Sequence, residues 1–196
     1  MEGEPQMRKQ LLEYAGIAAS VVLVAFGVGA IVTGFNGRDT VRHDLKRERI
    51  VGTPDSTIPG QLVDTGSEAQ AFAKVMRKHA LEATGGRTYA QMGRYIDKNG
   101  KETNVEKQAA KDPKTGQPVE NGARNIWVTE TALSQALNTA YFAERVSVFA
   151  IVMGFALLLT GIGLLVLTLR VFRELRVTGA LKSPREKPAS EAPSSA

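Results

Sequence analysis

Few residues of this sequence could support metal chemistry. The chain contains two histidines, His43 and His79, and no cysteine. Facial-triad iron sites and zinc hydrolase sites combine two or three histidines with a carboxylate, often as H-E-x-x-H on one helix face. His43 and His79 are too far apart in the sequence to form that motif. We therefore predict no metal site, no cofactor-binding site and no catalytic residue. We interpret His79 as a core histidine that donates to a carbonyl group.

Two parts of the sequence contain carboxylates that could belong to a site. Asp97, Asn99 and Glu102 resemble the start of a calcium-binding loop, but a lysine stands at its fifth position and the glycine comes two residues early. Glu130 lies on an apolar helical stripe that begins at Ile126. We interpret Glu130 as an acid in the first turn of a helix, where it faces the positive end of the helix dipole.

The stretch HALEATGGRTYAQMGRYID, residues 79–97, contains adjacent glycines and could be a phosphate-binding loop. Such loops place their glycines after a strand, with G-x-G-x-x-G or G-x-x-x-x-G-K-[ST] spacing. Neither spacing is present here, and Gly85 and Gly86 follow a predicted helix. We expect the two glycines to form the left-handed end of that helix.

Capping signals predict a helix on each side of the two glycines. Thr65 and Glu68 form a capping-box pair at the start of a helix over 66–84, whose apolar residues recur on one face. Thr88 and Gln91 repeat the pattern and predict a second, shorter helix. The stretch 79–97 is therefore interpreted as a structural corner.

Two long runs without a charged residue, 14–35 and 146–169, could each cross a membrane. About 20 apolar residues at 1.5 Å each cover a hydrocarbon core of ~30 Å. The first run follows Arg8 and Lys9 and could be a signal peptide, but its apolar region is too long and no A-x-A cleavage site follows. We expect a retained anchor. Neither run holds an acidic or basic residue, which disfavours a carrier.

The segment between the runs, 36–143, is predicted to be a small helical domain outside the cytoplasm. Asn36-Gly37 indicates a break, followed by a short charged helix over 39–50. Residues 97–124 are polar and rich in turn residues, so we expect a mobile loop. After Ile126 the apolar periodicity continues into the second run. The predicted fold class is mainly α: two antiparallel transmembrane helices with an extracytoplasmic small helical head domain.

Charge at the ends of the chain predicts its orientation. The formal net charge is +5 and the pI is about 9.6, and basic residues flank the runs in segments 1–13 and 170–196. Short basic flanks stay in the cytoplasm, whereas long segments cross largely regardless of charge. We predict a bacterial plasma-membrane protein with both termini cytoplasmic and no nucleic-acid partner. The 170–196 tail would bind anionic lipid and be disordered at its end.

Small residues recur every seven positions in both apolar runs. They are Ser20, Gly27 and Gly34 in the first run, and Ser147, Gly154, Gly161 and Thr168 in the second. Small residues at this interval give each helix a narrow face that permits close, left-handed packing. We predict that the two faces form one seam, within a chain or between chains.

Several strings of residues stand in a distinctive order. They are GTPD, TGSEA, AFAKVMRKHALEATGGRTYAQMGRY and ARNIWVTETALSQALNTAYFAERV, placed between the two apolar runs. This order resembles a family of two-span actinobacterial membrane proteins without an assigned function, over nearly the whole chain except the tails. Some members carry the label aromatic ring-opening dioxygenase, which the two histidines do not support. The resemblance implies a plasma-membrane protein and assigns no functional residue.

These observations favour a non-enzymatic accessory or scaffold protein of the cell envelope that acts through its external head. Its expected partners are the lipid bilayer and an envelope protein or a second copy of the chain. Two other classes stay open. A small oligomeric channel lined by Thr and Ser would conduct ions, and a membrane-anchored envelope enzyme would lose activity when one carboxylate or histidine is changed.

The predicted orientation can be tested with reporter fusions at residues 5, 100 and 190. We expect a reporter that is active only outside the cytoplasm to work at position 100 and to fail at the two other positions, because the basic flanks hold both termini inside. A reporter active only in the cytoplasm provides the control. Extracytoplasmic activity at either terminus would refute the orientation.

Overall fold

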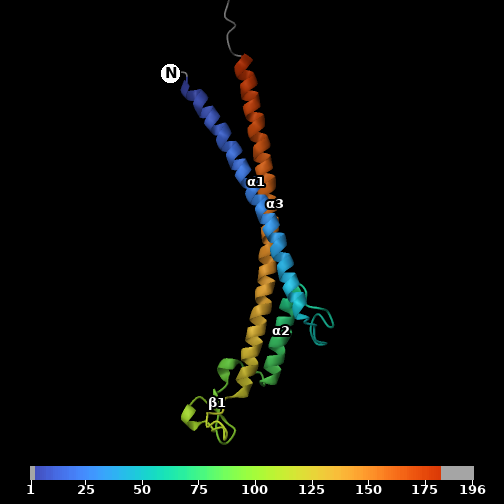
Figure 1. Cartoon of the computed structure of the whole chain (residues 1–196), viewed down its shortest axis with the longest axis vertical. Coiled ribbons are helices and arrows are strands. Elements are labelled where there is room, and N and C mark those ends of the chain that lie inside the picture. The colour runs from blue at the N-terminus through green and yellow to red at the C-terminus, as the bar shows by residue number, and fades with distance from the viewer. Residues whose placement is uncertain (1–2, 182–196) are drawn as a thin grey trace, which may run out of the picture. The chain divides into compact units, whose positions relative to one another are not determined.

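The computed structural model describes residues 3–181 and shows a mainly helical chain (Figure 1). Its elements in chain order are α1 (Gly3–Glu48), α2 (Gly66–Ala83), η1 (Tyr89–Gln91), β1 (Tyr95–Ile96), β2 (Glu102–Thr103), η2 (Glu106–Gln108) and α3 (Gly122–Leu181). Residue contacts divide the chain into two compact units, the first within Met1–Ile31 and Val152–Ala196 and the second over Val32–Ile151. The predicted disordered end of the tail lies outside the described residues.

The helices α1 and α3 contain the two apolar runs, and each is long and apolar enough to cross a membrane. The predicted continuity of the chain from Ile126 into the second run is confirmed, because α3 is one helix. The break predicted at Asn36-Gly37 is wrong, because α1 continues through it to Glu48. A Cβ on Gly37 would lie 2.8 Å from the Ser147 hydroxyl oxygen, so this glycine permits close packing against α3 instead of a turn.

In the first unit, α1 and α3 pack through small residues. A Cβ on Gly27 would lie 2.8 Å from the carbonyl oxygen of Gly154, and a Cβ on Gly154 would lie 2.8 Å from that of Gly27. A Cβ on Gly161 would lie 3.0 Å from the carbonyl oxygen of Ser20, which is itself fully buried. Backbones at this separation leave no space for larger side chains. The predicted seam is therefore confirmed as a contact within one chain.

The second unit has an apolar core to which all three α-helices contribute. In Figure 1, α2 (green) lies along the orange part of α3. The core is formed by Leu45 of α1, Val63 of the connector, Ala69, Phe72, Ala73 and Val75 of α2, and Leu137 of α3. The capping box of Thr65 and Glu68 begins α2, so the predicted helix and its cap are both confirmed.

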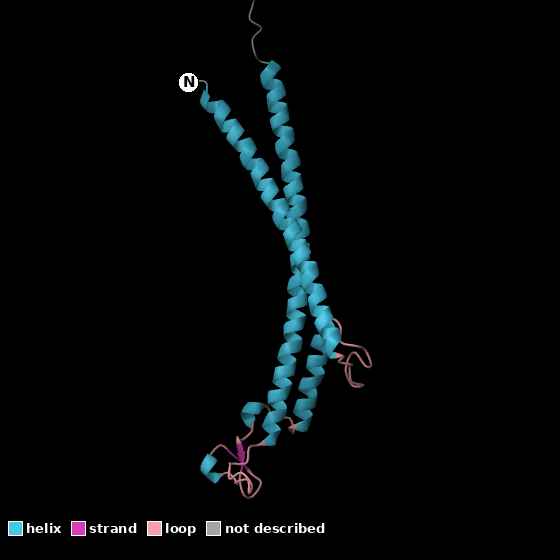
Figure 2. Cartoon of the chain, viewed as in Figure 1, coloured by secondary structure: helices cyan, strands magenta, loops and turns pink. Residues whose placement is uncertain are grey.

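A small lobe with strands connects α2 to α3 (Figure 2), where a second helix and a loop were predicted. The Gln91 side chain accepts a hydrogen bond from the backbone N–H of Thr88 as expected, but only the single 3₁₀ turn η1 follows. β1 then pairs with β2 in antiparallel register, Tyr95 opposite Thr103. Isolated bridges join Tyr95 to Glu120, Asp97 to Ala109 and Lys111 to Pro118. The predicted capping box is confirmed, but the second helix ends after one turn and does not include Met92, Tyr95 or Ile96 as predicted. The mobility of 97–124 stays a prediction.

Short turns explain why this polar segment forms strands. The Asp97 carboxylate accepts hydrogen bonds from the backbone N–H groups of Asn99 and Lys101, each at 2.8 Å. Gly100 has a φ of 76°, which closes the turn between β1 and β2. Backbone groups are thus paired across the turn without an apolar face. Because hydrophobic periodicity is the main signal for strands, the sequence pattern does not reveal this pairing.

The corner after α2 has the left-handed backbone that the adjacent glycines predicted. Gly85 and Gly86 have φ values of 62° and 78°. The Gly86 N–H donates to the carbonyl oxygen of Leu81 at 2.7 Å, which satisfies one of the last carbonyls of the helix. The left-handed end that the two glycines predicted for α2 is therefore confirmed.

Trp127 of α3 holds the corner in place. Its side chain is 3% exposed and packs with Ala80 and Met92 in a second apolar cluster. The indole N–H donates to the carbonyl oxygen of Arg87 at 2.9 Å. A buried indole with its donor satisfied joins the chain just after the glycines to the first turns of α3.

The left-handed corner predicts a cost for any side chain placed there. We expect Gly85→Ala and Gly86→Ala each to lower the free energy of unfolding by ~1 kcal/mol or more, because an L residue is disfavoured in this region. No atom lies within 4 Å of the added Cβ at either position, so the loss would reflect backbone strain. Denaturant unfolding in detergent, followed by the fluorescence of the one tryptophan of the chain, measures the change.

Gly122→Ala is the matched control for this experiment. Its added Cβ also has no atom within 4 Å, and Gly122 is not among the glycines with a left-handed φ. A loss at Gly122 equal to that at Gly85 and Gly86 would contradict the strain argument.

Candidate functional site

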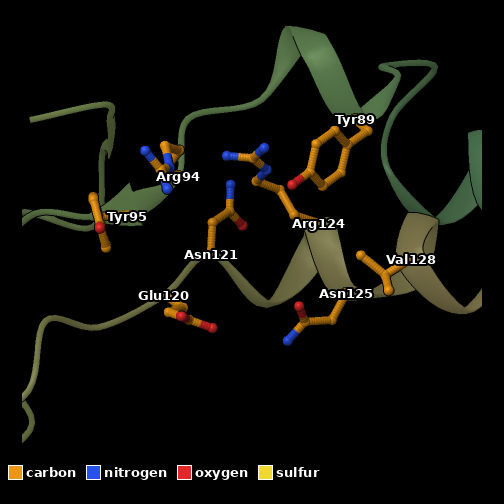
Figure 3. A pocket seen from close by; sticks show the side chains of 8 residues that line it. All are labelled: Tyr89, Arg94, Tyr95, Glu120, Asn121, Arg124, Asn125 and Val128. Atoms are coloured by element: carbon orange, nitrogen blue, oxygen red, sulfur yellow. The ribbon is translucent and has the colours of Figure 1, made fainter.

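The lobe and the start of α3 enclose a polar pocket of about 130 Å³ (Figure 3). We call it the Arg94–Arg124 pocket. Two arginines, two tyrosines and two asparagines supply most of its polar groups, and its full lining is Tyr89, Arg94, Tyr95, Glu120, Asn121, Arg124, Asn125 and Val128. The pocket therefore presents hydrogen-bond donors from two segments, 89–95 and 120–128, that the fold brings to one place.

Each arginine of the pocket lies against a tyrosine ring. The guanidinium carbon of Arg124 is 3.8 Å from the centroid of the Tyr89 ring, and that of Arg94 is 5.8 Å from the centroid of the Tyr95 ring. Stacking of a guanidinium on an aromatic face orients its plane and leaves its N–H edge available. The buried Nε of Arg124 has no hydrogen-bond partner within the described part of the chain.

A network around Glu102 positions the walls of the pocket. The Glu102 carboxylate accepts two hydrogen bonds from Arg87, each at 2.9 Å. It also accepts one from the Gly93 N–H at 3.0 Å and one from the Asn121 amide at 3.1 Å. The Asn121 amide donates to the Gly93 carbonyl as well. These bonds hold β2, the segment before β1 and the start of α3 together.

The same network changes the acidity of Glu102. The hydrogen bonds from Arg87 are the largest cause, followed by the one from the Gly93 N–H, and together they lower the pKa of Glu102 to about 2. Its carboxylate is ionised at neutral pH and engaged with its neighbours. The basic character of the nearby pocket is therefore due to Arg94 and Arg124, whereas Arg87 is neutralised by its ion pair.

A second polar cluster lies where α1, α2 and α3 meet; we call it the Glu144 cluster. Glu144 of α3 accepts hydrogen bonds from Arg42 Nε at 2.7 Å and Arg38 Nε at 3.3 Å, both on α1. Its other oxygen accepts from the N–H of Gly66, the first residue of α2, at 2.6 Å. Burial opposes ionisation of Glu144, but Arg42, the Gly66 N–H and Arg38 outweigh it and lower its pKa. The carboxylate thereby links one residue of α3 to two of α1 and to the first residue of α2.

The two histidines have different surroundings. His43 is exposed on α1. The His79 ring lies 3.0 Å from a carboxylate oxygen of Asp55, which also accepts from Lys78 at 2.8 Å. Hydrogen bonds from Lys78 and then from His79 lower the pKa of Asp55. The prediction that His79 donates to a carbonyl group is therefore wrong, because the connector brings Asp55 within reach. Glu82, three residues after His79, forms an ion pair with Lys78.

Glu130 is buried but does not lie in the first turn of its helix. α3 begins at Gly122, so the interpretation of Glu130 as a first-turn acid is wrong. Its side chain is enclosed, with the residue 4% exposed. It accepts a hydrogen bond from the Ser134 hydroxyl at 2.7 Å. Glu130 and His79 line one largely apolar groove of about 470 Å³ between α2 and α3, so the structure brings these two candidates to one surface.

The calcium-loop residues have other partners. Asp97 closes the turn between β1 and β2, and Glu102 belongs to the network described above. Within residues 3–181, no group of three or more His, Cys, Asp or Glu side chains is arranged to hold a metal ion.

Comparison with models of known protein families, with curated proteins and with solved structures finds no match to this chain. The resemblance to the two-span actinobacterial family therefore stays a prediction.

The sequence pattern did not single out Arg94, Arg124, Glu102 as a bridging group, or Glu144. Three of them have partners that are distant in the sequence: Tyr89 for Arg124, Asn121 for Glu102, and Arg38, Arg42 and Gly66 for Glu144. The one local signal was the sequence RTYAQMGRY, in which arginine and tyrosine alternate around the corner. Arginine and tyrosine are both enriched at binding surfaces, so this string could have indicated one.

The lowered pKa of Glu102 predicts an acid-dependent loss of stability in the lobe. A depressed folded-state pKa stabilises the folded protein above the unfolded-state value, and this contribution is lost as the pH falls through the folded-state value. The window is from about 4.5, the ordinary value, down to about 2. We expect Glu102→Gln to lower stability at pH 7 and to flatten the dependence on pH within this window, measured by denaturant unfolding with Trp127 fluorescence.

Glu106→Gln is the control for this measurement. Glu106 is exposed in the same lobe and forms no ion pair with any described residue. If wild type and Glu102→Gln lose stability equally between pH 5 and pH 3, the role of the Glu102 network would be disproved.

Proposed function

We propose that this chain is a two-span protein of the bacterial plasma membrane, with both termini cytoplasmic, that acts as a non-enzymatic accessory or scaffold protein of the cell envelope. Its second unit is the external head that recognises a partner. The observation that carries the proposal is that α1 and α3, the two helices able to cross a membrane, also contribute residues to the apolar core of the head. A head built in this way is tied to the bilayer at both of its ends.

The packing of α1 supports retention of the first run as an anchor. Leu45 is part of the head core, and Val41 packs against it. Arg38 and Arg42 pair with the buried Glu144 carboxylate. Cleavage by a signal peptidase after the first run would cut α1 within or close to this region. A cut that removed Arg38 and Arg42 would leave the buried Glu144 carboxylate without a cation.

The seam disfavours the channel alternative. A pore lined by Thr and Ser needs those hydroxyl groups on a surface shared between copies. Ser20 is fully buried and Thr168 is 9% exposed, and Thr168 would clash with a Cβ on Gly16 at 2.9 Å. These two hydroxyl residues are therefore occupied inside one α1–α3 pair. The outer faces of the runs carry large apolar side chains such as Phe26, Phe149 and Phe155, which suit lipid.

An enzyme is the less favoured alternative because the polar groups of the head have structural partners. Glu144, Glu102 and Asp55 are each engaged with arginine, lysine or histidine. Nucleophilic and acid–base catalysis needs a reactive group next to a positioned base in a cleft. The described residues offer instead a surface pocket with cationic donors, which suits recognition.

A crosslinking experiment in native membrane tests this function. A photo-crosslinking amino acid placed at the exposed position Val105, or at Val128 on the rim of the Arg94–Arg124 pocket, should capture one envelope protein in a stoichiometric complex. The same amino acid at Phe26, which faces outward from the first run, is the control for random collisions in the membrane. Capture of no protein at the head positions, or of the same proteins at all three, would contradict the proposal. Ion flux in liposomes containing the purified chain would favour the channel.

A further inference from the structure

The two arginines of the Arg94–Arg124 pocket are not neutralised by a neighbouring carboxylate. Neither guanidinium forms an ion pair with any residue in the described range 3–181, in contrast to Arg87, Arg38 and Arg42. Glu120 lines the same pocket but makes no ion pair with either arginine there. In Figure 3 the Glu120 side chain extends away from the Arg124 guanidinium. Two like charges at one small cavity repel each other unless an anion is present.

The donors of this pocket have a geometry suited to an oxyanion. Arg124 is stacked on Tyr89 at 3.8 Å, so its guanidinium plane is held in place before a ligand arrives. Its buried Nε has no partner among the described protein groups. Carboxylate and phosphate oxygens accept paired N–H···O bonds from a guanidinium, so an arginine without an ion pair at a pocket suits either group. Asn121 caps α3 through its Oδ1, which accepts from the Ala123 N–H at 3.1 Å.

The size of the pocket limits what it holds. Its volume is about 130 Å³, below the ~300–1,000 Å³ of pockets that enclose a whole small molecule. At ~30 Å³ for each water, it has the space of a few water molecules and thus of one carboxylate or phosphate group. Because Arg94, Tyr89 and Asn125 are exposed, the rest of a ligand can extend into solvent.

We propose that the Arg94–Arg124 pocket binds the carboxylate or phosphate group of a larger molecule, with Arg124 as the principal donor and Arg94 as the second. Tyr89 positions Arg124. This inference goes beyond the proposed function, because it names a ligand chemistry for the head and holds whatever the orientation of the chain in the membrane. The proposed site is a small pocket for one charged group and not an extended docking surface.

Titration calorimetry with the purified full-length chain in non-ionic detergent tests the site. Inorganic phosphate and acetate are titrated separately into the protein, with sodium chloride adjusted to hold the ionic strength constant. We expect saturable binding of at least one of the two anions. Phosphate alone identifies a phosphate site, acetate alone a carboxylate site, and both together a general oxyanion site. Absence of saturable heat from both anions would overturn the proposal.

Variants assign the binding to this pocket. Arg124→Gln and Arg94→Gln should each weaken binding about tenfold or more, because each loses a charge-assisted hydrogen bond. Tyr89→Leu should weaken it and Tyr89→Phe should preserve it, because only the ring is needed for stacking. Arg145→Gln is the matched control: its guanidinium carbon lies 5.1 Å from the centroid of Tyr141 without lining the pocket.

The comparison separates a specific site from general attraction to a basic protein. Equal weakening by Arg145→Gln and Arg124→Gln would overturn the proposal. Because Arg94 is exposed, Arg94→Gln provides a test that does not depend on the fold tolerating a change at Arg124. Trp127 fluorescence establishes that each variant is folded. A failure of anion binding together with successful crosslinking of an envelope partner would remove this inference and leave the proposed function intact.

Discussion

The Glu144 carboxylate is the point at which all three α-helices of the second unit are joined. It binds two arginines of α1 and the first N–H of α2 from its own place on α3. Gly66 makes this possible, since a Cβ there would lie 2.8 Å from Glu144 Oε2 and 2.8 Å from the Tyr141 Cα. A negative charge at the N-terminus of α2 is also favoured by the helix dipole. This interaction joins the start of α2 to α1 and α3 within the second unit.

The arrangement around Glu144 leads to the pocket through a series of fixed contacts. α2 packs its apolar face against Leu45 and Leu137 and ends at the left-handed glycines. Trp127 then holds the corner by its hydrogen bond to the Arg87 carbonyl. The Arg87 side chain in turn binds Glu102, which also binds Asn121. The pocket is thus supported by the Arg87–Glu102 ion pair, whereas Arg94 and Arg124 form no ion pair within the described part of the chain.

Glycine has two physical roles in this chain. In the first unit, Gly27, Gly154 and Gly161 let the backbones of the apolar helices α1 and α3 approach closely. In the second unit, Gly66 and Gly37 also permit close packing against α3, whereas Gly85 and Gly86 are needed for their left-handed backbone. The same residue type therefore has two physical roles, and the neighbouring atoms distinguish them.

The sequence by itself determined the elements whose signals are local or strongly periodic. The apolar runs, the capping box at Thr65 and Glu68, the glycine corner and the seven-residue spacing of small residues are all visible without a structure, because each depends on neighbours within a few turns of one helix. The interpretation of Asn36-Gly37 as a break was wrong because tertiary packing against Ser147 outweighed the turn preference of these residues. The β1–β2 pairing was missed because it has no apolar alternation.

Only the tertiary structure decided which polar residues meet. Glu144 with Arg38, Glu102 with Asn121, and Tyr89 with Arg124 are each separated by many residues in the chain, and nothing in their local sequence identifies the partner. Asp55 likewise reaches His79 only because the connector folds back on α2. Which polar groups pair depends on how the three helices and the lobe fold against one another. For that reason the candidate site became visible only in three dimensions.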